Sequence, residues 1–189
     1  MGGLWVARVR AGSLSHDRLR LLARLGDPTA RLFLGGIWPA PERADELLVG
    51  LRPFANRGLM LRSVLGVAEL AVPAWEANTD SRLRAQAREA IDGARAWLLA
   101  ILEGHEEVEV AARAKDTADR VLYEALHQPE PALSAGRAVS EPATTIAATG
   151  GRFLSSAEVT VELVEAAGVG VEAIREAVLS AVRESSLDE

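Results

Sequence analysis

The sequence predicts an all-α protein, built as a multi-helix bundle or as an irregular stack of antiparallel helical hairpins. Three observations predict this class: apolar residues recur at helical spacing along most of the chain, recognisable caps and breakers bound those stretches, and no convincing strand pattern interrupts them. Hydrophobic residues make up 49% of the 189 residues, and much of that share is alanine. Alanine favours closely packed helices because it loses no side-chain entropy. A chain of this length suits one compact unit.

Local signals in residues 1–36 predict an N-terminal helical hairpin. Ser15 is a candidate N-cap before a periodic apolar stretch, and Gly26 supplies a C-terminal stop. Asp27, followed at once by proline, predicts the start of a second helix, with the aspartate as N-cap and the proline in the first turn. That helix is expected to end at Gly35. Two helices joined by so short a connection should pack against each other.

A main helical bundle is expected over residues 41–184, followed by a loose tail at 185–189. Apolar periodicity, capping-box spacing and proline breaks predict helices at Pro41–Gly50, Ala55–Ala77 with a stop or kink near Pro73, Arg82–Glu103, His105–His127, Gly136–Thr149 entered or interrupted at Pro142, Ser155–Ala167 and Val171–Glu184. The stretch 82–103 has the clearest periodicity, and it should form an antiparallel hairpin with the helix that follows it. The prolines in Gln128–Ala135 indicate a loop.

Composition and charge exclude several classes of function. The net charge of −6 argues against a broad nucleic-acid surface, which needs positive charge to release counterions. Cysteine is absent, which removes disulfides, thiolate metal sites and cysteine nucleophiles, and suits a reducing compartment. Apolar runs such as Ala96–Leu102 are too short to span a bilayer, and Met1–Arg10 holds no run of signal-peptide length. We therefore expect a soluble, cytoplasmic protein that enters no membrane. Lys115 is the only lysine, a bias typical of GC-rich genomes, which indicates a bacterial source.

The sequence offers no motif for catalysis or for metal binding. It contains no nucleophile elbow and no glycine-rich phosphate loop. The histidines His16, His105 and His127 are scattered, and although His105 and Glu109 could share a helical face, no third ligand accompanies them. We predict that the protein is not an enzyme and holds neither a metal nor another cofactor.

Two features could bind a protein partner. Trp38 lies in a loop stiffened by prolines, where an indole can either cover the core or anchor a partner. Glu106, Glu107 and Glu109 form an acidic turn at the start of a predicted helix, where carboxylates stabilise the positive end of the helix dipole. The same turn could attract a basic protein, mainly by speeding association. Trp38 and the acidic turn are therefore the candidate binding residues.

Two alternative functions remain open. A helix-turn-helix would explain the apolar spacing around Gly168, but its recognition helix would present two glutamates beside Arg175, a poor match to phosphate. A DNA-binding function is therefore disfavoured. A small-molecule binder or an enzyme could instead assemble its site from dispersed residues, namely His105, Asp116 and Tyr123.

Two segments of the chain resemble known helical proteins. The first comprises Gly12-Ser13-Leu14-Ser15, Arg18-Leu19-Arg20-Leu21-Leu22-Ala23 and Leu25-Gly26-Asp27-Pro28-Thr29-Ala30-Arg31, and it resembles an N-terminal motif of uncharacterised helical proteins from GC-rich bacteria. The second, Asp80 to Leu98, contains Arg88-Glu89-Ala90-Ile91-Asp92 and Ala94-Arg95-Ala96-Trp97, and it is similar to the all-helical fifth family of immunity proteins of polymorphic toxin systems. The alanine-rich helices that follow also look alike. The resemblance implies a non-catalytic protein that works by binding another protein.

These observations lead to one principal hypothesis about function. We expect a helical protein-binding module, in the immunity-like case one that sequesters its partner by covering part of the partner's surface. An acidic helical face would meet a basic surface of that partner. A helical scaffold or adaptor without a toxin partner would leave the same sequence pattern, and a homo-oligomer is equally compatible with it.

Overall fold

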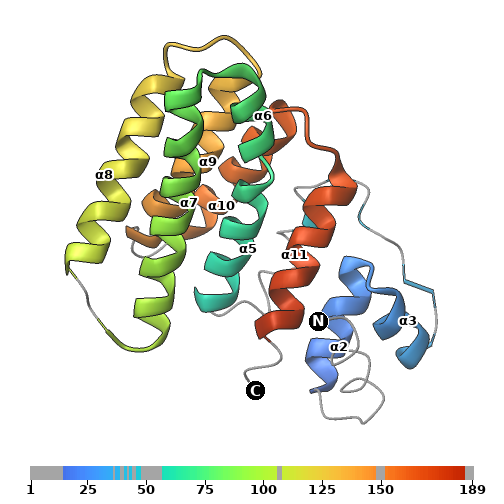
Figure 1. The fold of residues 1–189 in the computed structure, drawn as a ribbon. Helices are drawn as coiled ribbons and strands as arrows, with labels where there is room; N and C mark the ends of the chain where they lie inside the picture. Colours follow the sequence, from blue (N-terminus) through green and yellow to red (C-terminus); the bar gives the residue numbers. More distant parts are fainter. Residues whose placement is uncertain are drawn as a thin grey trace.

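The computed structural model describes residues 15–35, 37–38, 41, 43, 46–47, 57–105, 108–147 and 152–185. Within those ranges the chain is α-helical and contains no strand, so the predicted all-α class is confirmed. The helices are α2 (His16–Leu25), α3 (Pro28–Leu34), α5 (Arg57–Glu69), α6 (Val72–Asn78), α7 (Ser81–Leu102), α8 (Val108–Ala125), α9 (Ala132–Ala147), α10 (Arg152–Ala166) and α11 (Val171–Ser185) (Figure 1).

The N-terminal hairpin forms where its local capping signals predict it. Ser15 Oγ accepts a hydrogen bond from the N–H of Arg18 at 3.3 Å, and α2 ends at Gly26, whose φ of 101° suits glycine. Asp27 then caps α3 because its Oδ1 accepts a 2.8 Å hydrogen bond from the N–H of Ala30. The hairpin lies beside α11, on the opposite side of the molecule from α8 (Figure 1).

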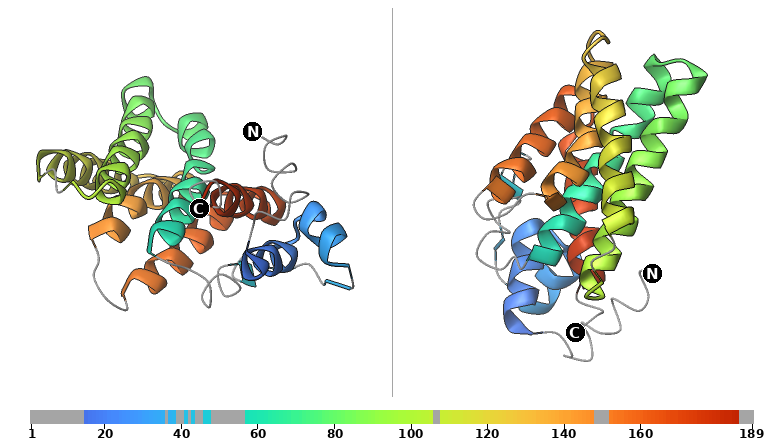
Figure 2. Two further views of the ribbon diagram at one scale, coloured as in Figure 1. Left: turned by 90° about the horizontal axis from the view of Figure 1, so that it is seen from below. Right: turned by 90° about the vertical axis from the view of Figure 1, so that its left-hand side faces the viewer.

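The remaining helices form a bundle around α5 and α9. Helix α5 packs against α7, α9, α10 and α11, and helix α9 packs against α5, α6, α7, α8 and α10. Helices α7 and α8 form the antiparallel hairpin that the sequence predicts (Figure 2). Trp75 of α6 is fully buried, and its indole N–H donates to the carbonyl oxygen of Leu83 at 2.9 Å, which ties α6 to the first turn of α7.

Helix α9 approaches its neighbours closely because residue 136 is glycine. A Cβ atom at Gly136 would lie 2.5 Å from both the Cβ of Ala125 and the Cζ3 of Trp75. No side chain fits within that distance, so α8, α6 and α9 meet at a point where only glycine is tolerated without movement. This contact fixes the separation of three helices.

The expected start of α8 is wrong. His105 belongs to the C-terminal cap of α7, which ends at Leu102. The N–H of His105 donates to the carbonyl oxygen of Ala100 at 2.8 Å, and Gly104 between them has a φ of 79°. Helix α8 begins at Val108. His105 and Glu109 therefore share no helical face, and the two-ligand pair considered from the sequence does not form.

The expected starts of α9 and α10 are also wrong. Helix α9 begins at Ala132, because the Glu130 carboxylate accepts hydrogen bonds from the N–H and the hydroxyl of Ser134 at 3.3 and 2.9 Å. Pro142 lies inside α9, where packing against five neighbouring helices outweighs the lost backbone hydrogen bond. Helix α10 begins at Arg152, so Ser155 lies within the helix and is not its N-cap.

Helix α8 ends at Ala125, two residues before the expected His127, and the loop expected at Gln128–Ala135 ends before Ala132. The remaining expected boundaries are confirmed to within one residue or lie mostly outside the described residues. The break near Pro73 is confirmed, since α5 ends at Glu69 and α6 begins at Val72. Of the helix expected at 41–50, the structure describes four residues, of which positions 46 and 47 are helical. Of the tail at 185–189, Ser185 is the last residue of α11 and the rest lies outside the described residues.

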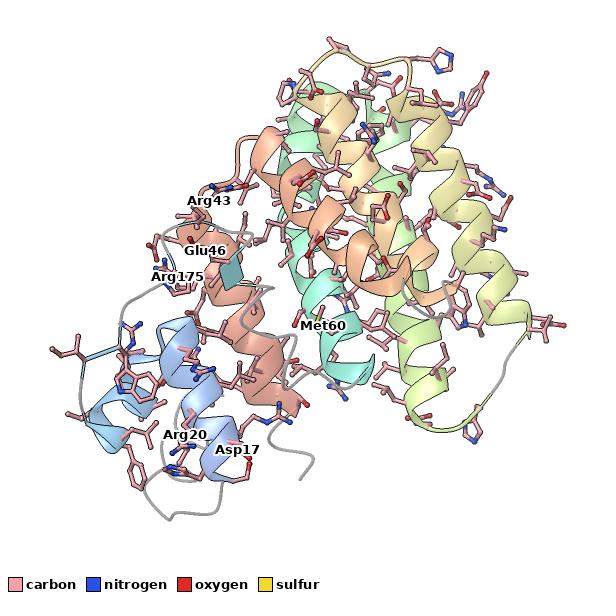
Figure 3. All side chains as sticks on the ribbon, turned by 180° about the vertical axis from the view of Figure 1, so that it is seen from behind. Asp17, Arg20, Arg43, Glu46, Met60 and Arg175 are labelled. Carbon is pink, nitrogen blue, oxygen red and sulfur yellow. The ribbon has the colours of Figure 1, made fainter. Side chains whose placement is uncertain are left out.

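Helix α11 is tied to the segment that precedes α5. The guanidinium of Arg175 donates to Glu172 Oε1 at 2.6 Å and to the carbonyl oxygen of Pro41. Arg175 lies on the side of α11 that faces the segment carrying Arg43 and Glu46 (Figure 3). The guanidinium of Arg175 is therefore hydrogen-bonded within the protein.

One stretch of the described chain, Gly58–Asn78, is long and apolar enough to cross a membrane when judged by length and composition alone. It covers most of α5 and all of α6, and 61% of its 18-residue apolar window is buried inside the bundle. A core helix passes the same test, so this stretch is weak evidence for a membrane span.

Candidate protein-binding groove

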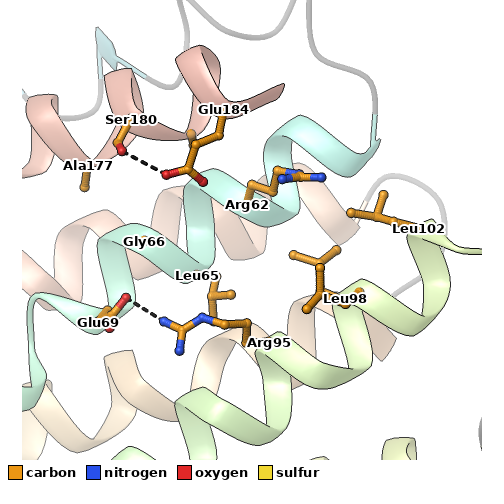
Figure 4. A pocket seen from close by; sticks show the side chains of 12 residues that line it. Arg62, Leu65, Gly66, Glu69, Arg95, Leu98, Leu102, Ala177, Ser180 and Glu184 are labelled. Carbon is orange, nitrogen blue, oxygen red and sulfur yellow. Dashed lines mark hydrogen bonds and ion pairs between the residues drawn. The ribbon is translucent and has the colours of Figure 1, made fainter. Parts of the chain in front are cut away.

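A groove of about 380 Å³ lies between α5, α7 and α11 (Figure 4). Its floor is apolar and small, and consists of Leu65, Gly66, Leu98, Ala177 and Ala181. Its rim is polar, and carries Arg62, Glu69, Arg95, Ser180 and Glu184. The groove therefore combines an apolar centre with a charged edge, as the cores and rims of protein interfaces do.

The groove exists because two helices pack on a third without packing closely on each other. Helices α7 and α11 both contact α5 and lie on either side of it (Figure 1), whereas contact between α7 and α11 is marginal at most. Gly66 of α5 lies against Ala177 of α11, since a Cβ atom at position 66 would be in van der Waals contact with the carbonyl oxygen of Ala177 at 3.7 Å. Ser180 and Ala181, one turn further along α11, are too small to fill the space above α5.

Two leucines of α7 form the apolar wall of the groove. Leu99 and Leu102 are 47% and 42% exposed, although Leu98 beside them is buried. Removing leucine side chains from water is favourable, so a protein surface that covered Leu99 and Leu102 would gain binding free energy. These residues are the part of the groove that a partner would gain most by covering.

The opposite end of the groove carries an ion-pair triad, Glu69–Arg95–Asp92. Arg95 Nη2 donates to Glu69 Oε2 at 2.8 Å, and Arg95 Nη1 donates to Asp92 Oδ1 at 2.8 Å. Because one guanidinium serves two carboxylates, the triad has a net charge of −1 at neutral pH. The side chains of Glu69 and Asp92 remain 53% and 71% exposed, so both carboxylates can still be approached from solvent.

A second hollow of about 260 Å³ lies on the other side of the triad. Glu69 and Asp92 line it together with Val72, Pro73, Ile91 and Arg88. Glu69 lines both hollows, so the triad separates two parts of one surface that follows α7. The surface extends from Arg88 to Leu102, about 21 Å at the rise of an α-helix.

Glu76 of α6 and Arg88 of α7 bind each other at the far end of this surface. Arg88 Nε donates to Glu76 Oε1 at 2.5 Å, and Arg88 Nη2 donates to Glu76 Oε2 at 2.9 Å. This hydrogen bonding lowers the pKa of the Glu76 carboxyl below its ordinary value, against the raising effect of burial. The same pairing raises the pKa of Arg88. The pair holds α6 against α7.

The chemistry of the groove suits recognition by shape and charge. Ser180 is the hydroxyl residue on its rim, and that hydroxyl donates to Glu184 Oε1 at 3.2 Å without a histidine in the lining. A nucleophilic serine needs a base that can take its proton and hold it, and a carboxylate alone is poorly matched to that task. Among the residues that the structure describes, no group of three or more His, Asp or Glu is placed to hold a metal ion.

The binding residues expected from the sequence lie elsewhere. Trp38 is half-buried against the core, and its indole N–H donates to the carbonyl oxygen of Gly35 at 2.7 Å. Glu109 is exposed in the first turn of α8, whereas Glu106 and Glu107 lie outside the described residues. The loop of Trp38 follows α3, and α3 and α8 lie on opposite sides of the molecule (Figure 1). Trp38 and Glu109 therefore form no common site, and neither lines the groove.

The residues of the two alternative functions are not brought together either. Asp116 pairs with Arg120, and His105 lies beyond the end of α7. The rings of Tyr123 and His127 contact each other in a tilted arrangement, with centroids 4.9 Å apart. All three candidates of the small-molecule alternative are exposed and line neither hollow. In the helix-turn-helix alternative, α11 packs on α5 and the head group of Arg175 is already bound.

The sequence contains a signal for the groove in the residue spacing of α7, although it forms no recognised motif. The α7 residues along the surface recur four and three positions apart, at Arg88, Asp92, Arg95, Leu99 and Leu102. This spacing is that of a helix seam which contacts another helix. The buried stripe of α7 is the stronger pattern in the sequence, because its residues are more uniformly apolar than those along the groove.

Comparison with known proteins identifies no relative. No family model matches the chain, and no curated protein and no solved structure is significantly similar to it.

Proposed function

We propose that this protein is a non-catalytic protein-binding module that holds an amphipathic helix of another protein in the groove between α5, α7 and α11. The observation that carries the proposal is the groove itself: α7 and α11 flank α5 without packing closely on each other, and the floor between them is lined by small and apolar side chains. Helix axes pack about 8–10 Å apart, at a distance set by the side chains at the contact, and small side chains allow the closer approach. A helix is therefore the element that such a space accommodates.

The distribution of side chains supports a helix with one apolar face. Leu99 and Leu102 would contact apolar residues of the bound helix, while the rim charges would remain at the edge in contact with water. Recognition of this kind uses apolar anchors that recur every three or four residues. The groove is open along one side, which suits a protein segment better than a small molecule that needs enclosure.

The resemblance of Asp80 to Leu98 to immunity proteins supports a particular use of this binding. Those residues include much of the α7 surface. A protein that binds a helix of a toxin in this groove would occlude the surface around that helix. A scaffold that binds a helix of a harmless partner would use the same contacts, and the genes beside this one would separate the two cases.

Photo-cross-linking in the native host tests the proposal. A photoreactive amino acid placed at Leu99 should capture one protein, through a segment that is helical and amphipathic. The matched control is Leu126, an exposed leucine at the end of α8 that lies outside the groove. Ser180→Arg should abolish the adduct at Leu99 by filling the groove, and Ser180→Ala should preserve it.

Three outcomes would contradict the proposal. The first is equal capture at positions 99 and 126, and the second is capture at 99 that survives Ser180→Arg. The third is the absence of any protein adduct, with a small molecule recovered from the purified protein instead. Leu99 and Ser180 are exposed, so we expect every variant to fold. Circular dichroism of each variant checks this.

A further inference from the structure

We propose that the triad Glu69–Arg95–Asp92 selects a basic side chain, lysine or arginine, on the helix that the groove binds. This inference rests on the proposed function and adds the chemistry of the partner to it. The triad lies between the two hollows, so a helix that occupies both must pass over it. Whatever side chain the helix places there meets two carboxylates and one guanidinium.

The hydrogen bonds of the triad leave carboxylate oxygens free to accept. Arg95 uses Oε2 of Glu69 and Oδ1 of Asp92, one oxygen from each carboxylate. A carboxylate accepts hydrogen bonds at both of its oxygens, so each retains acceptor capacity. A cation on the partner would bind these oxygens and bring the local charge from −1 to zero. A glutamate or aspartate at that position would face two like charges.

The neighbouring charges do not alter this preference. Arg88 donates from Nε and Nη2, one edge of its guanidinium, to the two carboxylate oxygens of Glu76, so that pair contributes no net charge. In the groove itself the remaining charges, Arg62 and Glu184, are opposite in sign and cancel, so the excess of one carboxylate belongs to the triad. The half of the surface around the triad is therefore mildly acidic, whereas the half around Leu99 and Leu102 is apolar.

The spacing along α7 predicts where the basic residue lies in the partner. Asp92 and Leu99 are seven residues apart on one face of α7, and Arg95 and Leu99 are four apart. A helix lying along that face needs a similar separation, since both helices rise by about 1.5 Å per residue. The bound helix should thus carry lysine or arginine four to seven positions from the apolar residue that contacts Leu99.

The test measures cross-linking from position 99 in variants of the triad. Glu69→Gln and Asp92→Asn remove one charge each and keep the shape of the side chain. Each should reduce the adduct yield roughly two- to fivefold, with a smaller effect at high salt. Asp119→Asn, an exposed carboxylate of α8, is the matched control and should leave the yield unchanged. Glu109→Gln tests the acidic turn of α8 in the same assay.

The outcomes separate this inference from the proposed function. The selection of a basic side chain is overturned if both triad substitutions leave the adduct yield at position 99 unchanged. It is also overturned if the captured helix carries an acidic residue in the predicted window. Either result leaves the proposed binding of a helix in the groove standing. No groove-specific adduct at all overturns both. The remaining outcome is a lower adduct yield that accompanies a lower melting temperature and does not change with salt. It would assign the triad to the packing of α5 on α7 and would likewise overturn the inference.

Discussion

Asp27 and Arg183 are 156 residues apart in the sequence, yet they form a buried ion pair that joins the N-terminal hairpin to α11. Asp27 Oδ2 accepts hydrogen bonds from Arg183 Nε at 2.9 Å and from Nη2 at 2.6 Å. The Asp27 side chain is fully buried, and its other oxygen caps α3. Burial lowers the pKa of Arg183, but Asp27 and Glu176 outweigh it and raise that pKa above its ordinary value. Arg183 therefore stays charged.

Removing Arg183 should destabilise the protein strongly. Arg183→Ala leaves the Asp27 carboxylate buried without a counter-ion, and the free energy of unfolding should fall by about 3 kcal/mol. Asp27→Asn combined with Arg183→Ala should be less destabilised than Arg183→Ala alone, because asparagine still caps α3 and carries no charge. Urea denaturation measures both values. The control is Arg120→Ala, which breaks an exposed pair with Asp116 and should cost less than about 1 kcal/mol.

Glycine-to-alanine substitutions should have opposite consequences at two helical sites. Gly136→Ala forces a Cβ atom to within 2.5 Å of Trp75 and Ala125, so α9 must move and stability should fall by about 1–3 kcal/mol. Gly66→Ala meets only ordinary contacts at 3.7 Å and beyond, and should be neutral or stabilising because alanine favours helices. Thermal melting of the two variants side by side measures the difference. Equal melting temperatures would show that α9 does not pack as described.

Trp38 should act as a cover for the core. Because its ring packs against buried residues and its N–H is bound within the loop, Trp38→Ala should lower the free energy of unfolding by about 2 kcal/mol. The affinity of the folded protein for the partner captured through the groove should be unchanged. Loss of affinity at full stability would instead make Trp38 a binding hot spot, as the alternative from the sequence has it.

The Glu76–Arg88 pair should make stability depend on acid pH. The folded-state pKa of Glu76 lies below its ordinary value of 4.5, mainly because of the hydrogen bond from Arg88. The pair therefore stabilises the folded state above the unfolded pKa, and this contribution is lost as the pH falls through the folded pKa. The stability difference between the wild type and Glu76→Gln should shrink between neutral pH and about pH 3. Urea denaturation across that range measures it, and a constant difference would contradict the assignment.

The candidate site could be read from the sequence only in part. The spacing of Arg88, Asp92, Arg95, Leu99 and Leu102 marks a second face on α7, but nothing in that spacing shows whether the chain itself covers the face. The answer depends on how α11 packs on α5, because α7 and α11 flank α5 with at most marginal contact between them and leave the face open. Trp38 and Glu109 drew attention because tryptophan and acidic runs stand out in a sequence, and the structure places them apart.

The helical class and the helix ends that depend on local contacts follow from the amino-acid sequence alone. The caps at Ser15, Asp27 and Asp80 bond to residues two or three positions away, so the chain near each of them contains everything the interaction needs. The course of α9 through Pro142 depends instead on distant contacts. Packing against five other helices compensates for the proline, which the local sequence predicts would interrupt the helix. The pairing of Asp27 with Arg183 and the opening of the groove also require the tertiary structure, since both depend on which distant helices lie side by side.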